Sequence, residues 1–170
     1  LVRQMRDLGE HAGPLLDDPA TGALALEGAV TARMRHVSHP TGTIGQPLAG
    51  SLLPWIDSAL PDGRSREEWK GEAETNRILG LDPAVAVDGL CVRIGALRCH
   101  ASALTIALNR DVPMDAIEEA IRETSAWTRL VPNTPEASHA RLTPAATTGS
   151  LDVPVGRLRR MRTDPRHIAA

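Results

Sequence analysis

The sequence predicts an α+β fold, in which a mixed or antiparallel sheet is covered by helices on one side. Segments with the apolar spacing of helices are separated from short segments rich in Val, Ile and Leu, in the order helix, loop, helix, strands, helix, strands. The 170 residues have an apolar share of 42% and a charged share of 24%, which are typical of one globular domain. A chain of this composition is able to bury a core.

The first half of the chain is expected to contain two helices and a long loop. Apolar residues recur at helical spacing over residues 1–16, whereas residues 23–35 are compatible with either a helix or a strand. Residues 39–50 are rich in Pro and Gly and are expected to form a loop. A helix is predicted over residues 65–79, because Ser65 and Glu68 form a capping box and Gly80 follows the last turn.

The second half is expected to hold most of the sheet. Strands are predicted at residues 85–87, 90–94 and 103–108, where Val, Ile and Leu are frequent or alternate with smaller residues. A helix is predicted to begin at Asp111-Val112-Pro113, because Pro is favoured in a first turn. Strand-like or irregular segments are expected from there through Val131, Leu142 and Val155.

Charge and composition exclude several classes of partner. The net charge of -2 is spread without long blocks of one sign, so we expect neither a nucleic acid nor a membrane partner. No apolar stretch approaches the length of a membrane span, and no secretion signal opens the chain, so a cytoplasmic location is expected. Cys91 and Cys99 lack the spacing of a metal site and fit reduced thiols. A small molecule or a protein is the expected partner.

Glu67 and Lys70 are the first candidate site residues. Lys70 is the only lysine among nineteen basic residues, although the remaining basic positions are all arginine. The spacing puts both side chains on one helix face, which is also what a solvated salt-bridge ladder requires. Two features favour a binding role: a lysine offers a compact charge for a phosphate, and the neighbouring Trp69 is expected to anchor the helix.

Arg93 and His100 are the second pair of candidates. An arginine between apolar strand residues either reaches solvent or awaits a carboxylate or phosphate. His100 is either a histidine satisfied within the core or a general base. Cys99 is not paired with His100, since adjacent strand residues point to opposite faces. The same alternation would separate Arg93 from His100, so we predict irregular backbone between them, beginning near Gly95.

Four runs of sequence resemble bacterial aspartate-semialdehyde dehydrogenases, and together they span essentially the whole chain. They are QPLAGSLLPWID at 46–57, SREEWKGEAETN at 65–76, VDGLCVRIGALRCH at 87–100 and LTPAA at 142–146. The resemblance implies a catalytic and dimerisation domain like the C-terminal domain of glyceraldehyde-3-phosphate dehydrogenase. Because the chain opens at Leu1 and stops after an arginine-rich stretch, residues 1–170 are expected to be a partial domain, truncated at both ends.

The resemblance also implies a reaction and roles for the four candidates. The family reduces L-aspartyl 4-phosphate to L-aspartate 4-semialdehyde with NADPH, releasing phosphate, in lysine, threonine and methionine biosynthesis. His100 resembles the family's acid–base histidine, Arg93 the residue that binds the substrate carboxylate, Glu67 the one that holds the amino group, and Lys70 the one that contacts phosphate. These roles agree with the charges of the side chains.

Parts of the expected enzyme are missing from this sequence. No Gly-x-Gly-x-x-Gly motif follows a predicted strand, so the N-terminal dinucleotide-binding domain, which would bind most of the NADP, is expected to be absent from this chain. The family's nucleophilic cysteine is expected upstream of Leu1. The fragment alone is therefore expected to be inactive, and the full-length protein is expected to be a homodimer.

Two alternatives to this interpretation stay open at the sequence level. One is a related acyl-phosphate reductase, such as N-acetyl-glutamyl-phosphate reductase, whose substrate has a capped amino group and would leave Glu67 without an ammonium partner. The other is a non-catalytic dimerisation or binding module of the same fold. That module would leave Lys70, Arg93 and His100 scattered in space.

Overall fold

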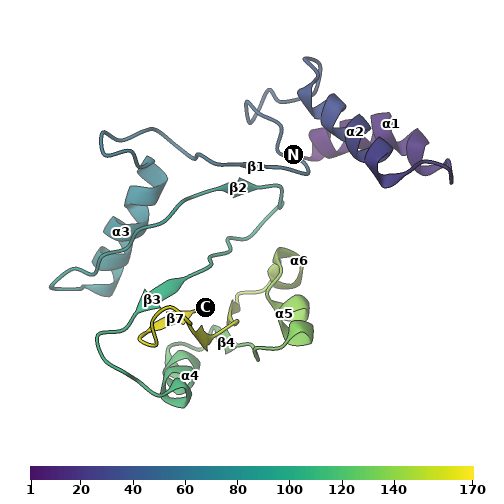
Figure 1. Cartoon of the computed structure of the whole chain (residues 1–170). Helices are drawn as coiled ribbons and strands as arrows, with labels where there is room; N and C mark the ends of the chain where they lie inside the picture. The colour runs from purple at the N-terminus through teal and green to yellow at the C-terminus, as the bar shows by residue number, and fades with distance from the viewer. The chain divides into compact units, whose positions relative to one another are not determined.

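The computed structural model describes residues 1–170 and divides them into two compact units, Leu1–Gly95 and Ala96–Ala170 (Figure 1). Each unit combines helices with short strands, and both antiparallel and parallel pairs occur, so the predicted α+β class is confirmed. The strands form three separate sheets of two, three and two strands. The single sheet expected from the sequence is thus divided into short pieces.

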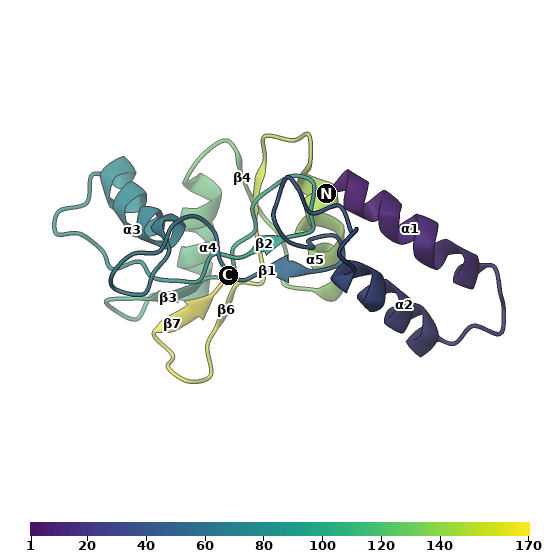
Figure 2. The ribbon, with the colours of Figure 1, turned by 90° about the horizontal axis from the view of Figure 1, so that it is seen from above.

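The first unit opens with two helices, α1 (Val2–Leu16) and α2 (Ala23–Arg35), which pack side by side in both views (Figures 1 and 2). The ambiguous segment 23–35 is therefore a helix. An ion pair joins the two helices, because Arg33 Nε donates to Asp7 Oδ2 over 2.8 Å. The side chain of Asp7 is only 14% exposed, so this pair is better shielded from water than a surface salt bridge.

Gln4 fastens α1 to the loop that follows α2. Its side chain is buried at 1% exposure, donates to the Gln46 carbonyl, and accepts hydrogen bonds from the amides of Leu48 and Ala49. Ala12, Leu48 and Ala49 form the apolar part of this core. The predicted loop at 39–50 is confirmed as a series of turns. The Gln4 side chain holds it in place, and no strand pairs with it.

A third helix and a two-stranded sheet complete the first unit. In the sequence, helix α3 (Arg66–Leu79) follows β1 (Leu52–Leu53) and precedes β2 (Arg93–Ile94). The two strands pair antiparallel, with Leu53 opposite Arg93. The strand predicted at 85–87 is absent. The Asn76 side chain accepts from the Val85 amide and donates to the Val85 carbonyl, so both backbone groups are satisfied without a partner strand.

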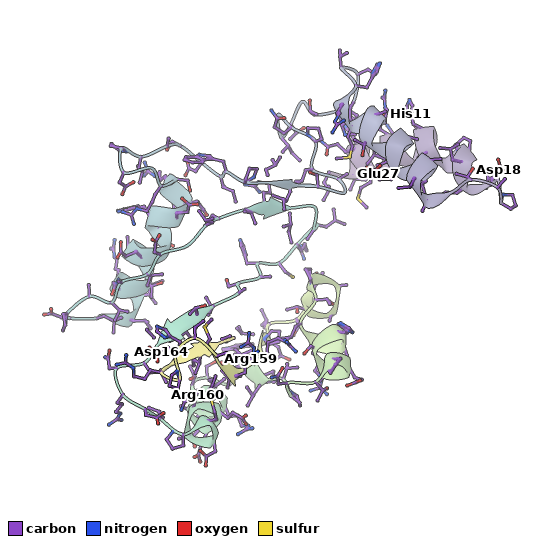
Figure 3. All side chains as sticks on the ribbon, in the orientation of Figure 1. His11, Asp18, Glu27, Arg159, Arg160 and Asp164 are labelled. Carbon is purple, nitrogen blue, oxygen red and sulfur yellow. The ribbon has the colours of Figure 1, made fainter.

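The second unit contains a three-stranded antiparallel sheet in the order β3 (Thr105–Ala107), β7 (His167–Ala169), β6 (Arg159–Arg160). Arg160, which Figure 3 labels, ties this sheet to the loop before α4 (Met114–Glu123), since it contacts Asp111 and the Val112 carbonyl. Helix α4 begins next to the predicted Pro113. The buried Ile168 lies in the central strand β7.

A parallel pair, β4 (Thr128–Leu130) and β5 (Val153–Val155), forms the third sheet. Parallel strands need a crossover connection, and here it contains α5 (Pro135–Arg141) and α6 (Pro144–Thr147). The sequence analysis missed both helices, although each begins with a threonine cap followed by proline. None of the helices is long and apolar enough to cross a lipid bilayer.

Candidate functional site

The start of helix α3 is fixed by the predicted capping box. The Glu68 amide donates to Ser65 Oγ over 3.2 Å, and the Ser65 amide donates to Glu68 Oε2 over 2.7 Å. Ser65 and Glu68 are both buried, at 0% and 9% exposure. The first turn of α3 is therefore held rigidly, and it carries Glu67 and Lys70 at defined positions.

Glu67 and Lys70 form a partly exposed cluster with Asp57. Lys70 Nζ lies 2.9 Å from Glu67 Oε2 and 3.7 Å from Asp57 Oδ2. The hydrogen bond to Glu67, and next its charge, raise the pKa of Lys70, so the ammonium stays protonated at neutral pH. The side chains are 36–41% exposed, which leaves the cluster open to a ligand from solvent. Glu67 and Lys70 thus share one helix face, as predicted, and they form the ion pair that a solvated salt-bridge ladder requires.

Trp69 does not anchor the helix as expected. Its side chain is 44% exposed, because it follows the buried Glu68 on α3 and points away from the core of the unit. The capping box, and not the indole, fixes this turn. A hollow of about 350 Å³ lies along the same helix, and Lys70, Glu74, Thr75 and Ile78 contribute to its lining. Of the expected site residues, Lys70 is the one that lines this hollow.

Arg93 lies on the short strand β2, in the same unit as Glu67 and Lys70. Its side chain is exposed and makes no ion pair or side-chain hydrogen bond within the chain. The sequence left open whether Arg93 reaches solvent or is buried to await an anion. In the structure it reaches solvent. Such a guanidinium is available to a carboxylate or a phosphate from outside the chain.

Gly95 ends β2 by a close backbone approach. A Cβ atom built on Gly95 would lie 2.9 Å from the Leu48 carbonyl oxygen, a distance that side chains do not tolerate. The backbone from Gly95 to His100 is irregular, as predicted. The glycine therefore ends β2 where the strand passes the buried turn at Leu48.

His100 lies in the second unit and is exposed. Its exposure rules out a histidine satisfied within the core. The preceding Cys99 has a φ of 75° and places its Sγ 3.4 Å from Thr148 Oγ1 and 3.6 Å from the Pro144 carbonyl oxygen. The thiol thus contacts the segment around α6. Neither Cys99 nor His100 lies in a strand, so the strand alternation used to reject a Cys99–His100 pair does not apply here.

Cys91 is the residue through which α3 contacts the strand segment. Its amide donates to Glu68 Oε1 over 3.0 Å. Burial, and then the charges of Glu68 and Glu67, raise the pKa of the Cys91 thiol, which keeps it protonated and unreactive. The sequence analysis gave Glu68 only a capping role, because a hydrogen bond across 23 residues leaves no local signal.

Three of the helix N-termini in this chain are closed to a pyrophosphate group by their own side chains. A pyrophosphate group would need free amides at a helix N-terminus after a glycine-rich turn. The N-terminus of α3 is already filled by its own Glu68 carboxylate, and α5 and α6 are capped by threonine hydroxyls. These three helix starts therefore offer no free amides to a pyrophosphate.

The chain is thus an α+β domain whose first unit presents a cation and a carboxylate to solvent from the start of α3, and an unpaired arginine from β2. Such a domain is suited to binding a small zwitterionic or phosphorylated ligand. The chain belongs to the semialdehyde dehydrogenase family, because the family model for the dimerisation domain of semialdehyde dehydrogenase matches residues 2–170.

Solved structures agree with this assignment. An aspartate semialdehyde dehydrogenase from Francisella tularensis is 31% identical, with a TM-score of 0.91 over 99% of this chain and 45% of that one. Aspartate semialdehyde dehydrogenase II from Vibrio cholerae is 22% identical, with a TM-score of 0.66 over 97% of this chain and 42% of that one. The chain thus spans less than half the length of these proteins, and its fold is that of their dimerisation domain.

Proposed function

We propose that this chain is the substrate-holding part of an aspartate-semialdehyde dehydrogenase that converts L-aspartyl 4-phosphate to L-aspartate 4-semialdehyde and phosphate. The observation that carries the proposal is the Glu67–Lys70 pair, held at 2.9 Å on the capped first turn of α3 and open to solvent. The family match and the 31% identity to the Francisella tularensis enzyme support the same reaction.

Each candidate residue is given the role that the family resemblance implies, and its charge suits that role. Lys70 supplies a compact cation for the phosphate, and Arg93 supplies a planar guanidinium for the substrate carboxylate. Glu67 holds the substrate ammonium, which replaces Lys70 as its partner. His100 gives or takes a proton at the reacting carbonyl, a role for which an exposed imidazole is suited.

The open Glu67 carboxylate favours a substrate with a free amino group over an acylated one. An N-acetylated substrate has no ammonium, so it would leave Glu67 paired only with Lys70 and would gain nothing from its charge. We therefore prefer the aspartyl substrate to N-acetyl-glutamyl phosphate. The alternative of a non-catalytic module is tested through His100, because Lys70 and Arg93 lie in the first unit and His100 lies in the second.

The complete protein is proposed to contain a further domain that binds most of the NADP, and a nucleophilic cysteine ahead of α1. It is proposed to act in the cytoplasm as a homodimer, in keeping with the dimerisation domain family. The chain by itself would then lack both the thiolate and the hydride donor, so it would not turn over.

The proposal is tested in the complete polypeptide by following phosphate-dependent formation of NADPH from L-aspartate 4-semialdehyde and NADP. His100→Ala is expected to lower the rate by about 10²–10⁴-fold. Lys70→Ala is expected to raise the KM for phosphate. Arg77→Ala is the matched control, because Arg77 is an exposed cation in the last turn of the same helix. An unaltered rate in His100→Ala would refute the role given to the imidazole.

A further inference from the structure

Glu68 makes one hydrogen bond more than a capping box requires. Its Oε2 accepts from the Ser65 amide over 2.7 Å, which closes the cap, while its Oε1 accepts from the Cys91 amide over 3.0 Å. The two oxygens of one carboxylate therefore join the start of α3 to Cys91, which lies 23 residues after Glu68 in the sequence. Cys91 belongs to the segment that leads into β2.

The carboxylate is suited to join these segments permanently. It is buried at 9% exposure, and the amides of Ser65 and then Cys91 lower the pKa of Glu68. It is therefore ionised at neutral pH, and both oxygens act only as acceptors. A buried charge that lost one of its donors would be left partly unpaired, which is costly.

The hydrogen bond controls the distance between the two parts of the proposed site. Glu67 and Lys70 lie on the same helical turn as Glu68. Arg93 is two residues after Cys91, and two residues of extended chain span at most about 7 Å. Fixing the Cys91 amide on the first turn of α3 therefore limits how far the Arg93 backbone can move from Glu67.

We propose that Glu68 is a positioning residue, which sets the spacing between Glu67 on α3 and Arg93 on β2 so that one amino acid substrate reaches both. This inference rests on the proposed function. It distinguishes two ligands of the same enzyme: aspartate semialdehyde uses the helix for its ammonium and the strand for its carboxylate, whereas inorganic phosphate contacts Lys70 on the helix alone.

Glu68→Gln in the complete enzyme tests the inference. Glutamine has nearly the same shape, but only one of its two polar ends accepts a hydrogen bond, so it cannot serve the Ser65 and Cys91 amides together. The KM for aspartate semialdehyde is expected to rise about tenfold, with kcat little changed and the KM for phosphate unchanged. A KM that rises equally for both ligands, or for neither, would overturn the positioning role.

Two further variants separate positioning from stability. Ser65→Ala removes the cap hydroxyl but leaves the Glu68–Cys91 bond, so it should lower Tm without the KM split. In an Arg93→Ala background, Glu68→Gln should add no further loss of aspartate semialdehyde binding, because the strand then holds nothing to be positioned. Additive losses in that double variant would contradict the inference.

Glu68→Asp covers the case in which Glu68→Gln fails to fold. The shorter carboxylate keeps the charge at the helix start but cannot span both amides, and it should give the same KM split once its melting curve shows a folded protein. If Lys70→Ala and Arg93→Ala impair the enzyme while Glu68→Gln and Glu68→Asp leave the KM for aspartate semialdehyde unchanged, the positioning role fails and the proposed function stands. If the wild-type protein shows no activity, the proposed function itself fails.

Discussion

Asp7 organises the polar cluster between the two helices of the first unit. Its carboxylate accepts from Arg33 on α2 and from the His39 Nδ1 over 2.7 Å, and the His39 side chain is fully buried. The hydrogen bond from Arg33 is the main reason that the pKa of Asp7 lies well below its usual value. A single carboxylate thus holds α1, α2 and the start of the long loop together.

The lowered pKa of Asp7 predicts a specific acid sensitivity. In the unfolded chain the carboxyl titrates near pH 4, so its stabilising effect is fully present above about pH 4 and is lost as the pH falls below that value. Asp7→Asn should lower Tm at neutral pH and weaken the dependence of Tm on pH in the acid range. Thermal melts between neutral and acid pH measure both effects.

Asp18→Asn is the matched control for Asp7. Asp18 (Figure 3) lies in the connection between the same two helices and is exposed, and its side chain accepts only from the Ala20 amide. Its replacement should change Tm little. Equal acid dependence in Asp7→Asn and wild type would show that the cluster does not contribute to stability.

At the scale of elements, local sequence signals predicted what local contacts determine. The capping residues Ser65 and Glu68 gave the start of α3, and Gly80 gave its end, because each acts within a few residues. The strand expected at 85–87 was wrong, since the backbone of Val85 is satisfied by the Asn76 side chain. The segment 23–35 stayed ambiguous because its apolar residues do not gather on one helix face and none of its residues is buried.

The candidate site divides in the same way. The pairing of Glu67 with Lys70 followed from helical spacing alone. The hydrogen bond from the Cys91 amide to Glu68 joins residues that are distant in the sequence, and no sequence periodicity predicts it. The bend near Gly95 was predictable from the residue type, but its cause, the nearby Leu48 carbonyl, was not.

Gly95→Ala is expected to destabilise the chain by about 1–3 kcal/mol. The added methyl would meet a backbone oxygen, which cannot rotate away as a side chain can, so β2 must move from the Leu48 turn. Chemical denaturation measures the change. Gly89→Ala is the control, because nothing lies within 4 Å of a Cβ at Gly89; a similar loss in both variants would refute the steric explanation.

At the scale of the whole molecule, many large apolar side chains face solvent. Leu24, Val37 and Leu90 are 86–94% exposed in the first unit, and Leu97 and Leu151 are 68% and 73% exposed in the second. The buried apolar residues are few by comparison, namely Ala12, Leu48, Ala49, Val131, Leu158 and Ile168. Exposed apolar surface of this extent is typical of chains that associate with another protein surface.

The isolated chain is therefore expected to associate in solution. Analytical ultracentrifugation over a range of concentrations should show species larger than the 18.2 kDa monomer, and a dye that fluoresces on apolar surfaces should bind. High salt should not dissociate these larger species, since apolar contacts are not screened by ions. A monomer at all concentrations, with no dye binding, would contradict this expectation.

The buried Gln4 amide has a consequence for how opening of the first unit can be observed. The amide protons of Leu48 and Ala49 are held by a residue that precedes them by 44 and 45 positions. They can exchange with solvent deuterium only when their hydrogen bonds to Gln4 break. Their exchange rates therefore report how often α1 detaches from the loop. Two amide protons in the loop thus measure the local opening of a helix that is distant in the sequence.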